Sequence, residues 1–486
     1  MLESIAVASV IWWTFMGGLG SSPFLAKLSK FWHAWDVRNS DGYKRLDKLH
    51  ERYGEYVRLG PEELSITDPK AIEAIYGLRS TKILKPPFYD YSFPRRSLHS
   101  ARDTSEHDKR RRTAWTRAFS ADAIKNYENR VIMYTDKLSA QIDSDGTKPI
   151  NITKWLAFFA FDLMGDLAFG QSFDSLGKGD FHWGTKLLRD SGRGHVVLGK
   201  LPWLIEIIVR LQPFTTTEMQ TFYNWCAEQS EKRKHSKSTE KDISSYLLDA
   251  EPMSSDPAVN EMWRQEDTNL IVSAGSDTTT EVMSHCFYYL AKQPIHQQRI
   301  REELKVFDGR HPTAKEFLDL EYLNGYINEN LRLHHPVPCG LPRMTPPEGL
   351  QVGDRHIPGN ITVCCPQWMT GRCMSHYSAS LKLLMCGLAP KTYQRPLEVI
   401  PERWYSQPEL VINKGAFLPF FAGRWSCVGR PLALFQLQNM ITTMVSRYDV
   451  AFAPGEDGSG IIERSVDHVH LYPADMLLTF APRKTE

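Results

Sequence analysis

A stretch near the C-terminal end presents one cysteine between two glycines. The stretch runs from Phe420 to Pro431 and reads FFAGRWSCVGRP. Gly423 and Gly429 lack a Cβ, so the backbone can adopt positive φ or approach a flat ligand closely. Pro431 suits the first turn of a helix, which places Cys427 where unpaired N–H groups and two nearby arginines favour a thiolate. A thiolate can bind iron. The alternative is a small buried apolar cysteine, and the joint spacing of Phe, Gly, Cys and Gly favours the ligand.

A second set of polar residues falls in the middle of the helix expected from about Asn260 to Lys292. Gly275 costs this helix about 1 kcal/mol relative to alanine. Thr278 can donate its hydroxyl to the carbonyl of Ala274, which loosens the helix and opens a groove. Oxygen and a water would fit in such a groove beside an iron. Taken alone, Gly-x-Asp-Thr is a weak motif, and a cap or a kink would explain it as well.

The cysteine stretch resembles the haem-binding loop of the cytochrome P450 family, the haem-thiolate monooxygenases, whose usual form is F-x-x-G-x-R-x-C-x-G. The matching residues are Phe420, Gly423, Cys427 and Gly429. Trp425 stands where the family usually has an arginine that holds a haem propionate, and Arg424 lies one place earlier. The resemblance therefore implies rearranged propionate contacts. An aromatic residue at this position is similar to some fungal branches of the family.

The same resemblance assigns roles elsewhere in the chain. Ala274–Thr278 matches the family's A-G-x-D/E-T segment, in which Asp277 and Thr278 would relay protons to iron-bound dioxygen. Cys427 would be the axial iron ligand and would donate electron density that favours O–O cleavage. The implied fold is mainly α with a smaller β-rich part, the cytochrome P450 fold with a single large catalytic domain.

Four further residues are implied as contacts of the haem propionates. His107 and Arg111 lie four apart on one face of an expected helix and can act as hydrogen-bond donors. A basic run of this kind is more often a solvated helix face. Trp115 on the same helix and Arg343 after the Val337–Leu341 segment complete the implied set.

Glu329 and Arg332 match the family's E-x-x-R motif, and Pro401–Arg403 matches its P-E-R motif. Residues three apart on a helix can form an ordinary surface pair of little energetic worth. The resemblance instead implies a buried charged network of Glu329, Arg332 and Arg403 that supports the cysteine loop. These residues are expected to be structural and not catalytic.

The composition sets the broad class. The 486 residues have 42% hydrophobic residues and a formal net charge of +1, which is ordinary for a folded globular protein and gives no basis for nucleic-acid binding. The eight cysteines are scattered, unlike those of a secreted disulfide framework. We therefore expect a reducing compartment. Residues 27–486 are expected to form the haem domain.

Residues 1–26 are expected to be a marginal N-terminal membrane anchor. The run from Ile5 to Ala26 carries no charge, is barely long enough to span a bilayer, and is followed by Lys27 and Lys30. The positive-inside rule then keeps the rest of the chain cytoplasmic, which with the resemblance predicts the endoplasmic reticulum membrane. The alternative is a peripheral or buried apolar segment. The apolar stretch His195–Leu211 is either core or a surface that dips into the lipid interface.

The implied activity is insertion of one oxygen atom of O₂ into an apolar organic substrate, with haem b as cofactor, in the specialised metabolism of a fungus. The chain has no flavin or nicotinamide motif, so the electrons would come from an NADPH-dependent cytochrome P450 reductase. This partner would dock on the cysteine side, where Arg110, Arg112 and Arg430 offer positive charge. Two alternatives are a haem-thiolate isomerase or dehydratase that does not use O₂, and a non-catalytic haem protein.

The stretch Cys373–Leu388 favours the alternative of a non-catalytic haem protein, because it has no helical or strand periodicity. We interpret this stretch as translated intron. Cys373-Met374 can be encoded as TGT-ATG, which contains a GTATG donor, and Leu388-Ala389 as CTA-GCA, which contains a TAG acceptor. Excision would leave Arg-Ser-Pro-Lys-Thr-Tyr. If the stretch is retained in the protein, it is a surface insertion near the haem-supporting network.

Overall fold

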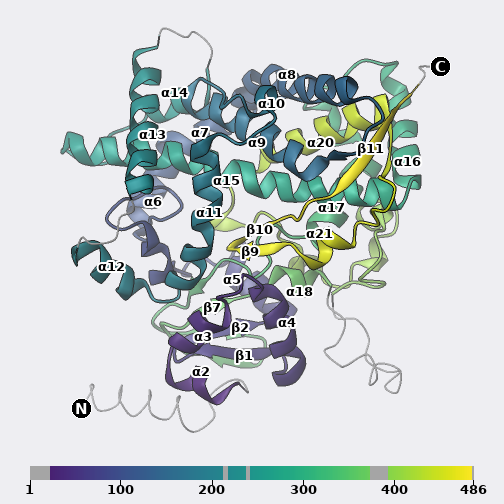
Figure 1. The fold of residues 1–486 in the computed structure, drawn as a ribbon. Helices are drawn as coiled ribbons and strands as arrows, with labels where there is room; N and C mark the ends of the chain where they lie inside the picture. Colours follow the sequence, from purple (N-terminus) through teal and green to yellow (C-terminus); the bar gives the residue numbers. More distant parts are fainter. Residues whose placement is uncertain (1–21, 212–216, 237–240, 373–391, 484–486) are drawn as a thin grey trace, which may run out of the picture.

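The computed structural model describes residues 22–211, 217–236, 241–372 and 392–483, and these form a mainly helical fold with small sheets (Figure 1). This confirms the predicted fold class. The larger helices are α4 (Gly42–Tyr53), α8 (Ala121–Asp145), α9 (Ile152–Phe169), α11 (Trp183–Leu198), α12 (Pro202–Leu211), α13 (Thr217–His235), α15 (Pro257–Lys292), α16 (Ile295–Leu304), α17 (Glu321–Leu333) and α20 (Arg430–Arg447). The shorter ones include α2 (Phe24–Leu28), α3 (Phe31–Asp36), α5 (Pro69–Tyr76), η1 (Pro87–Ser92), α14 (Ile243–Leu248), α18 (Gln367–Gly371) and α21 (Ser459–Glu463).

Helix α15 crosses the centre of the molecule and packs against α9 and α20 (Figure 1). It begins at Pro257, close to the predicted start, with Asp256 as its N-cap. A Cβ added to Gly275 would lie only 2.5 Å from Cε of Met164 on α9. The missing side chain at Gly275 leaves room for the Met164 side chain where α9 packs on α15.

The main sheet has four strands in the order β1 (Tyr56–Gly60), β2 (Glu63–Ile66), β7 (Thr362–Cys364) and β4 (Arg343–Met344). Strands β1 and β2 form the hairpin that the sequence predicts, with Tyr56 opposite Ile66. A second sheet joins β3 (Ile150–Asn151), β11 (Leu477–Pro482) and β8 (Tyr448–Phe452), and two hairpins pair β5 (Leu350–Val352) with β6 (Arg355–Ile357) and β9 (Val466–His468) with β10 (His470–Tyr472).

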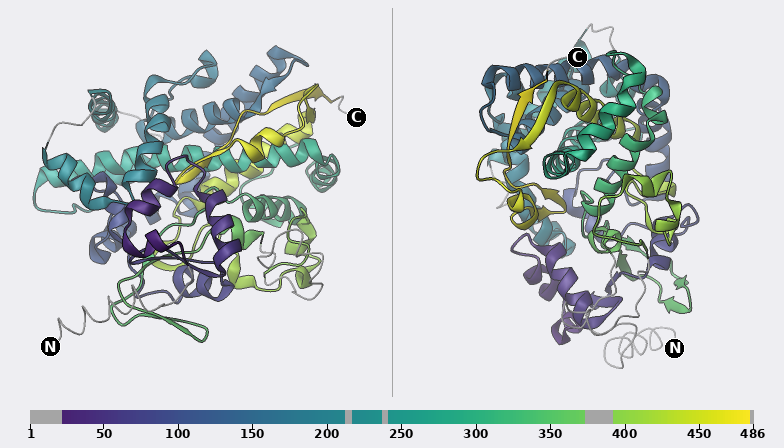
Figure 2. Two further views of the ribbon diagram at one scale, coloured as in Figure 1. Left: turned by 60° about the horizontal axis from the view of Figure 1, so that its bottom comes forward. Right: turned by 90° about the vertical axis from the view of Figure 1, so that its right-hand side faces the viewer.

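The four-stranded sheet and helices α2–α4 form one end of the molecule, and the helical part forms the other (Figure 2). Most of the expected membrane anchor, residues 1–21, lies outside the described residues, as does the stretch 373–388. Within the described part of the chain, no helix combines the length and the apolar character needed to cross a bilayer.

Candidate active site

The cysteine loop is a tight turn held by its own backbone and by α5. Residues Gly423–Trp425 form the short helix η8, and the N–H of Cys427 donates to the carbonyl of Phe420 at 2.8 Å. Gly423 has φ of +68°, and a Cβ there would lie 3.2 Å from the carbonyl oxygen of Gly77. Glycine is therefore required at position 423 for both conformation and space.

Gly429 differs from Gly423. Its φ of −75° suits any residue, and an added Cβ would meet Sγ of Cys427 at 3.7 Å, an ordinary contact. The expectation of positive φ or a close approach therefore holds for Gly423, whereas at Gly429 the missing side chain leaves space beside the sulfur. Pro431 lies in the first turn of α20, as predicted.

The Cys427 thiol lies within the fold and is still accessible to solvent. Burial raises its pKa above the ordinary value, and this effect exceeds the opposing influence of the Gly429 and Arg430 backbone N–H groups and of Arg111. The N–H groups lower the pKa of the thiol, as expected, but burial raises it by more. A metal ion bound at the sulfur would stabilise the thiolate.

The helix expected at the basic run from His107 to Ser120 is present, but a π-helical turn interrupts it. It comprises α6 (Thr104–Arg110), the π-helical turn η2 (Arg111–Trp115) and α7 (Thr116–Ala118). Such turns often occur at functional sites. Arg111 Nη1 donates to the carbonyl of Ser426 at 2.7 Å, and Nη2 donates to its hydroxyl at 2.9 Å. Arg111 therefore braces the loop directly beside Cys427.

His107 is buried and packs its ring 4.4 Å from that of Trp425. Burial, together with Lys85 and three arginines, lowers the pKa of His107 to about 2. The imidazole is therefore neutral at physiological pH. His107 and Arg111 are close to the loop, as expected, but only Arg111 has a charge to offer.

Among the residues expected to contact the propionates, two have a buried donor without a partner within the described residues. These are Nε1 of Trp115 and Nε of Arg343, whose side chains are 3% and 2% exposed. Arg343 otherwise donates through Nη1 to the Tyr89 hydroxyl at 2.6 Å. Buried donors are nearly always paired in folded proteins, so these atoms suit an acceptor supplied by a ligand. Carboxylates such as haem propionates fit this donor set.

In α15, the Thr278 hydroxyl donates to the Ala274 carbonyl at 2.7 Å, as predicted. Ala274 is exposed although α15 lies at the centre of the fold, and Leu270 and Thr278 on the same face are partly exposed. This face of α15 therefore borders accessible space.

Asp277 points into the protein, where it meets the C-terminal hairpin. Its Oδ2 accepts from the Tyr472 hydroxyl at 3.2 Å and lies 3.3 Å from Nε2 of His470. Asp277 is 5% exposed, and the His470 side chain is 22% exposed. The sequence reasoning missed both partners, because they follow Asp277 by nearly two hundred residues and carry no motif.

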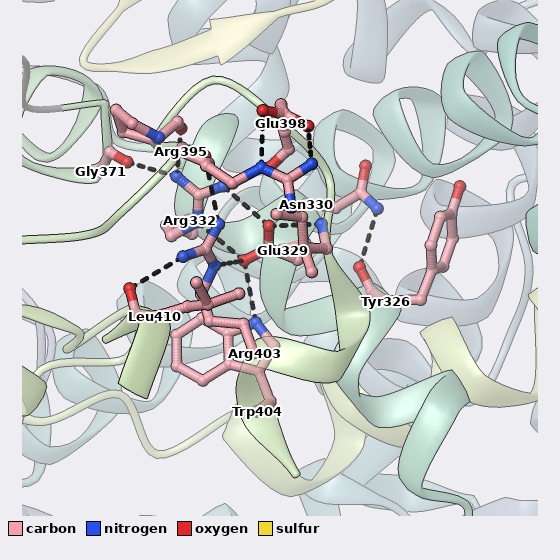
Figure 3. Close-up of polar contacts among 12 residues, drawn as sticks. Tyr326, Glu329, Asn330, Arg332, Gly371, Arg395, Glu398, Arg403, Trp404 and Leu410 are labelled. Atoms are coloured by element: carbon pink, nitrogen blue, oxygen red, sulfur yellow. Dashed lines mark hydrogen bonds and ion pairs between the residues drawn. The ribbon is translucent and has the colours of Figure 1, made fainter. Parts of the chain in front are cut away.

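The predicted charged network is present and buried (Figure 3). Arg332 binds both oxygens of Glu329 at 2.8 Å, and Arg403 Nε reaches Glu329 Oε1 at 3.2 Å. The indole of Trp404 donates to the same oxygen at 3.0 Å. The backbone N–H of Ile400 occupies the other oxygen at 2.9 Å. The carboxylate is therefore fully paired.

Two contacts reach the segment just before the cysteine loop, one from Trp404 of the network and one from His335, which follows α17. Trp404 packs its ring 4.2 Å from that of Phe417, and His335 Nε2 lies 3.1 Å from the carbonyl oxygen of Pro419. Phe420 follows directly and is the acceptor for Cys427. Neither Trp404 nor His335 carries a motif that would predict its contact with this segment from the sequence.

One surface prediction is wrong. Arg110 is 4% exposed, and its Nε donates to Asp267 of α15 at 2.6 Å. It therefore joins two helices and is not free to attract a partner protein. Arg112 and Arg430, from the same prediction, are exposed.

Comparison with known proteins gives one family match, Cytochrome P450, over residues 23–479. The chain is 37% identical to "Cytochrome P450 monooxygenase notG'" of Aspergillus versicolor, over 92% of this chain and 79% of the relative. It is 34% identical to "Cytochrome P450 monooxygenase lcsK" of Purpureocillium lilacinum, over 99% and 88%. It is also 36% identical to "Tryprostatin B 6-hydroxylase" of Neosartorya fischeri, over 92% and 79%.

Proposed function

We propose that this chain, which belongs to the cytochrome P450 family and is a haem-dependent monooxygenase, oxidises an apolar organic intermediate of fungal secondary metabolism. The observation that carries the activity is the accessible Cys427 at the start of α20 in a loop braced by Arg111. The relatives come from fungi and are monooxygenases or hydroxylases, so an isomerase or dehydratase that does not use O₂ is not favoured.

The cofactor we propose is haem b, held through its iron by Cys427 and through its propionates by buried donors. Trp115 and Arg343 offer unpaired N–H groups for this purpose, and Arg111 and His107 lie beside the loop. Phe420, Gly423 and Gly429 shape the turn that presents the sulfur. When bound, the haem supplies the oxidising chemistry, in which one atom of O₂ enters the substrate.

The chain's own part in the reaction is to deliver protons. We assign proton transfer to Asp277 and Thr278, the catalytic residues of this proposal. Tyr472 and His470 hold the Asp277 carboxylate, and the partly exposed imidazole of His470 borders solvent, so a proton can pass from solvent through the imidazole to Oδ2.

The electrons come from a separate redox protein, for which we propose an NADPH-dependent cytochrome P450 reductase. Its docking surface would be the cysteine side of the molecule. The Arg112 side chain is 70% exposed, with only a loose contact of 3.7 Å to Glu251, and Arg430 is exposed at the start of α20. These arginines can attract an acidic partner surface.

We propose that the enzyme acts at the endoplasmic reticulum membrane, with its catalytic domain in the cytoplasm. An apolar patch, formed by α2, α3 and α12, supports this location. Phe31 and Trp203 lie together with ring centroids 6.0 Å apart, and both are about half exposed. The remaining apolar members of the patch are Phe24, Leu25, Leu28, Trp35 and Ile207. Exposed apolar side chains on these elements, joined at Phe31 and Trp203, suit insertion into a lipid interface, in addition to an anchor within residues 1–26.

The stretch Cys373–Leu388 remains proposed as translated intron. Residues on both sides of the stretch contact the same side chain, Arg332. Gly371 accepts a hydrogen bond from Arg332 at 2.6 Å, and the Tyr393 ring lies 5.0 Å from the same guanidinium. A short connection therefore suffices between them. Sequencing the transcript decides the question: a message that retains these codons would make the stretch a surface insertion.

The activity is tested by co-expression with a fungal reductase in a yeast strain that supplies candidate apolar metabolites. Labelling with ¹⁸O₂ should place one ¹⁸O atom in the product, and the Cys427→Ser variant should make none. A product that forms without ¹⁸O uptake would contradict the monooxygenase assignment.

A further inference from the structure

Trp425 occupies the loop position where the family usually has an arginine, and its surroundings show how this chain uses an indole there. Trp425 is 8% exposed, and its Nε1 donates to the carbonyl of Ile83 at 2.9 Å. One neighbour is the ring of His107. Another is Lys85, whose Nζ lies 4.6 Å from the indole centre. Trp425 therefore contacts the segment that carries Lys85 both through a hydrogen bond and through a cation–π contact.

Arg424, one place earlier in the loop, does not supply the missing charge. Its Nε lies 3.2 Å from Oδ2 of Asp108, and both side chains are substantially exposed. Arg424 is thus engaged with a carboxylate at the surface.

Lys85 is the cation that remains in the interior beside Trp425. It is 5% exposed, and its Nζ donates to the backbone carbonyls of Leu98 at 3.2 Å and His99 at 2.6 Å. Within residues 22–211, 217–236, 241–372 and 392–483 it has no ion pair. Burial and two neighbouring guanidiniums, those of Arg343 and Arg111, lower the pKa of Lys85 well below its ordinary value.

This arrangement is unfavourable unless an anion joins it. A buried ammonium is normally paired with a carboxylate, and like charges around it add to its cost. Arg343 shares the location, since its guanidinium and the Lys85 ammonium both contact the Tyr89 ring, and it retains a donor without a partner. The group therefore suits a ligand with negative charge, and haem propionates are carboxylates of the required chemistry.

We propose that Lys85 is a propionate-binding residue of the haem site and replaces the charge that the loop lacks at Trp425. The indole then serves to position Lys85, through its contacts with Ile83 and with the ammonium itself. This inference rests on the proposed haem b.

The test compares Lys85→Met with Lys82→Met in the full-length holoenzyme. Lys82 is a matched control, because it lies three residues away, is exposed and pairs with Glu348 at the surface. Haem release is followed as transfer to excess apomyoglobin. We expect release from Lys85→Met to be about 10-fold faster or more, because a charge-assisted hydrogen bond is lost. Lys82→Met should match the parent, and Lys85→Arg should stay within a few-fold of it.

A second readout separates haem binding from a merely structural role. In haem-free protein from iron-limited culture, Lys85→Met should unfold at a temperature close to that of the parent, because removal of the buried amine offsets the loss of its hydrogen bonds to the Leu98 and His99 carbonyls. Adding Trp425→Arg to Lys85→Met should slow haem release again. Unchanged release, or equal destabilisation of the haem-free and haem-bound forms, would overturn the proposal. A parent protein that binds no haem would overturn the proposed function itself, and this assignment with it.

Discussion

His470 Nε2 lies 3.3 Å from Oδ2 of Asp277, and this contact joins the C-terminal hairpin to the middle of α15. Tyr472 donates to the same oxygen at 3.2 Å. The carboxylate is buried, whereas the His470 side chain is partly exposed. The pair therefore connects a buried acid beside Thr278 to solvent.

Replacing Asp277 by asparagine should lower product formation by about 100-fold or more, because the amide cannot carry a proton in the same way. His470→Gln should have a smaller effect in the same direction. The measurement is product formed per NADPH consumed with purified reductase, in H₂O and in D₂O. Asp449→Asn, at an exposed surface site, serves as the control. Unchanged coupling in Asp277→Asn would contradict the assigned role.

Breaking the buried network should unfold the haem-supporting region. Glu329→Gln leaves Arg332 and Arg403 without their carboxylate, at a cost of roughly 3 to 5 kcal/mol, and we expect a large loss of soluble haem-loaded protein. Urea unfolding measures the change. Glu228→Gln removes an exposed pair with Lys232 and should leave stability unaltered. Equal stability of the two variants would refute the structural role of Glu329.

His335 should make the folded protein less stable in mild acid. Burial lowers the pKa of His335 to about 4, below its value of about 6.5 in the unfolded chain. The unfolded state therefore binds more protons between about pH 6.5 and 4. Stability is fully present above this window and falls through it, by about 1.4 kcal/mol per pH unit for one such group.

The test is the pH dependence of the free energy of unfolding. His335→Gln should reduce its slope near pH 5 by about one proton, although the variant loses the contact with Pro419 and starts from a lower stability. A slope identical to that of the parent would show that His335 does not titrate as described.

The apolar patch on α2, α3 and α12 should contribute to membrane binding. Phe31→Glu with Trp203→Glu should weaken partitioning of the full chain onto phosphatidylcholine–phosphatidylserine vesicles by about 10-fold or more, because large apolar side chains no longer enter the interface. Flotation with the vesicles provides the measurement. Val306→Glu and Leu318→Glu, at exposed apolar sites on other elements, are the controls. Equal binding of both double variants would exclude the patch.

The structural features that could be predicted accurately from the sequence are those set by short local motifs. The hydrogen bond from Thr278 to Ala274 follows from their spacing on one helix, and the Glu329–Arg332 pair follows from theirs. The helix carrying Pro431 and the hairpin of β1 and β2 are also local patterns. These features depend on neighbours in the chain, which a single sequence displays.

Contacts between distant segments could not be predicted in this way. Burial of Arg110 against Asp267 depends on how α6 packs on α15, and a basic run looks the same whether it is buried or solvated. The partnership of Lys85 with Trp425 spans 340 residues without any motif. The rise in the pKa of the Cys427 thiol likewise depends on which residues bury it, and these come from distant parts of the chain.

The central claim is that the Cys427 thiolate ligates haem iron, and the most direct measurement is the reduced carbon monoxide difference spectrum of the purified protein. The account predicts the absorbance band characteristic of thiolate-ligated haem for the parent, and its loss in Cys427→Ser. A parent protein without this band, or a serine variant that retains it, would contradict the account.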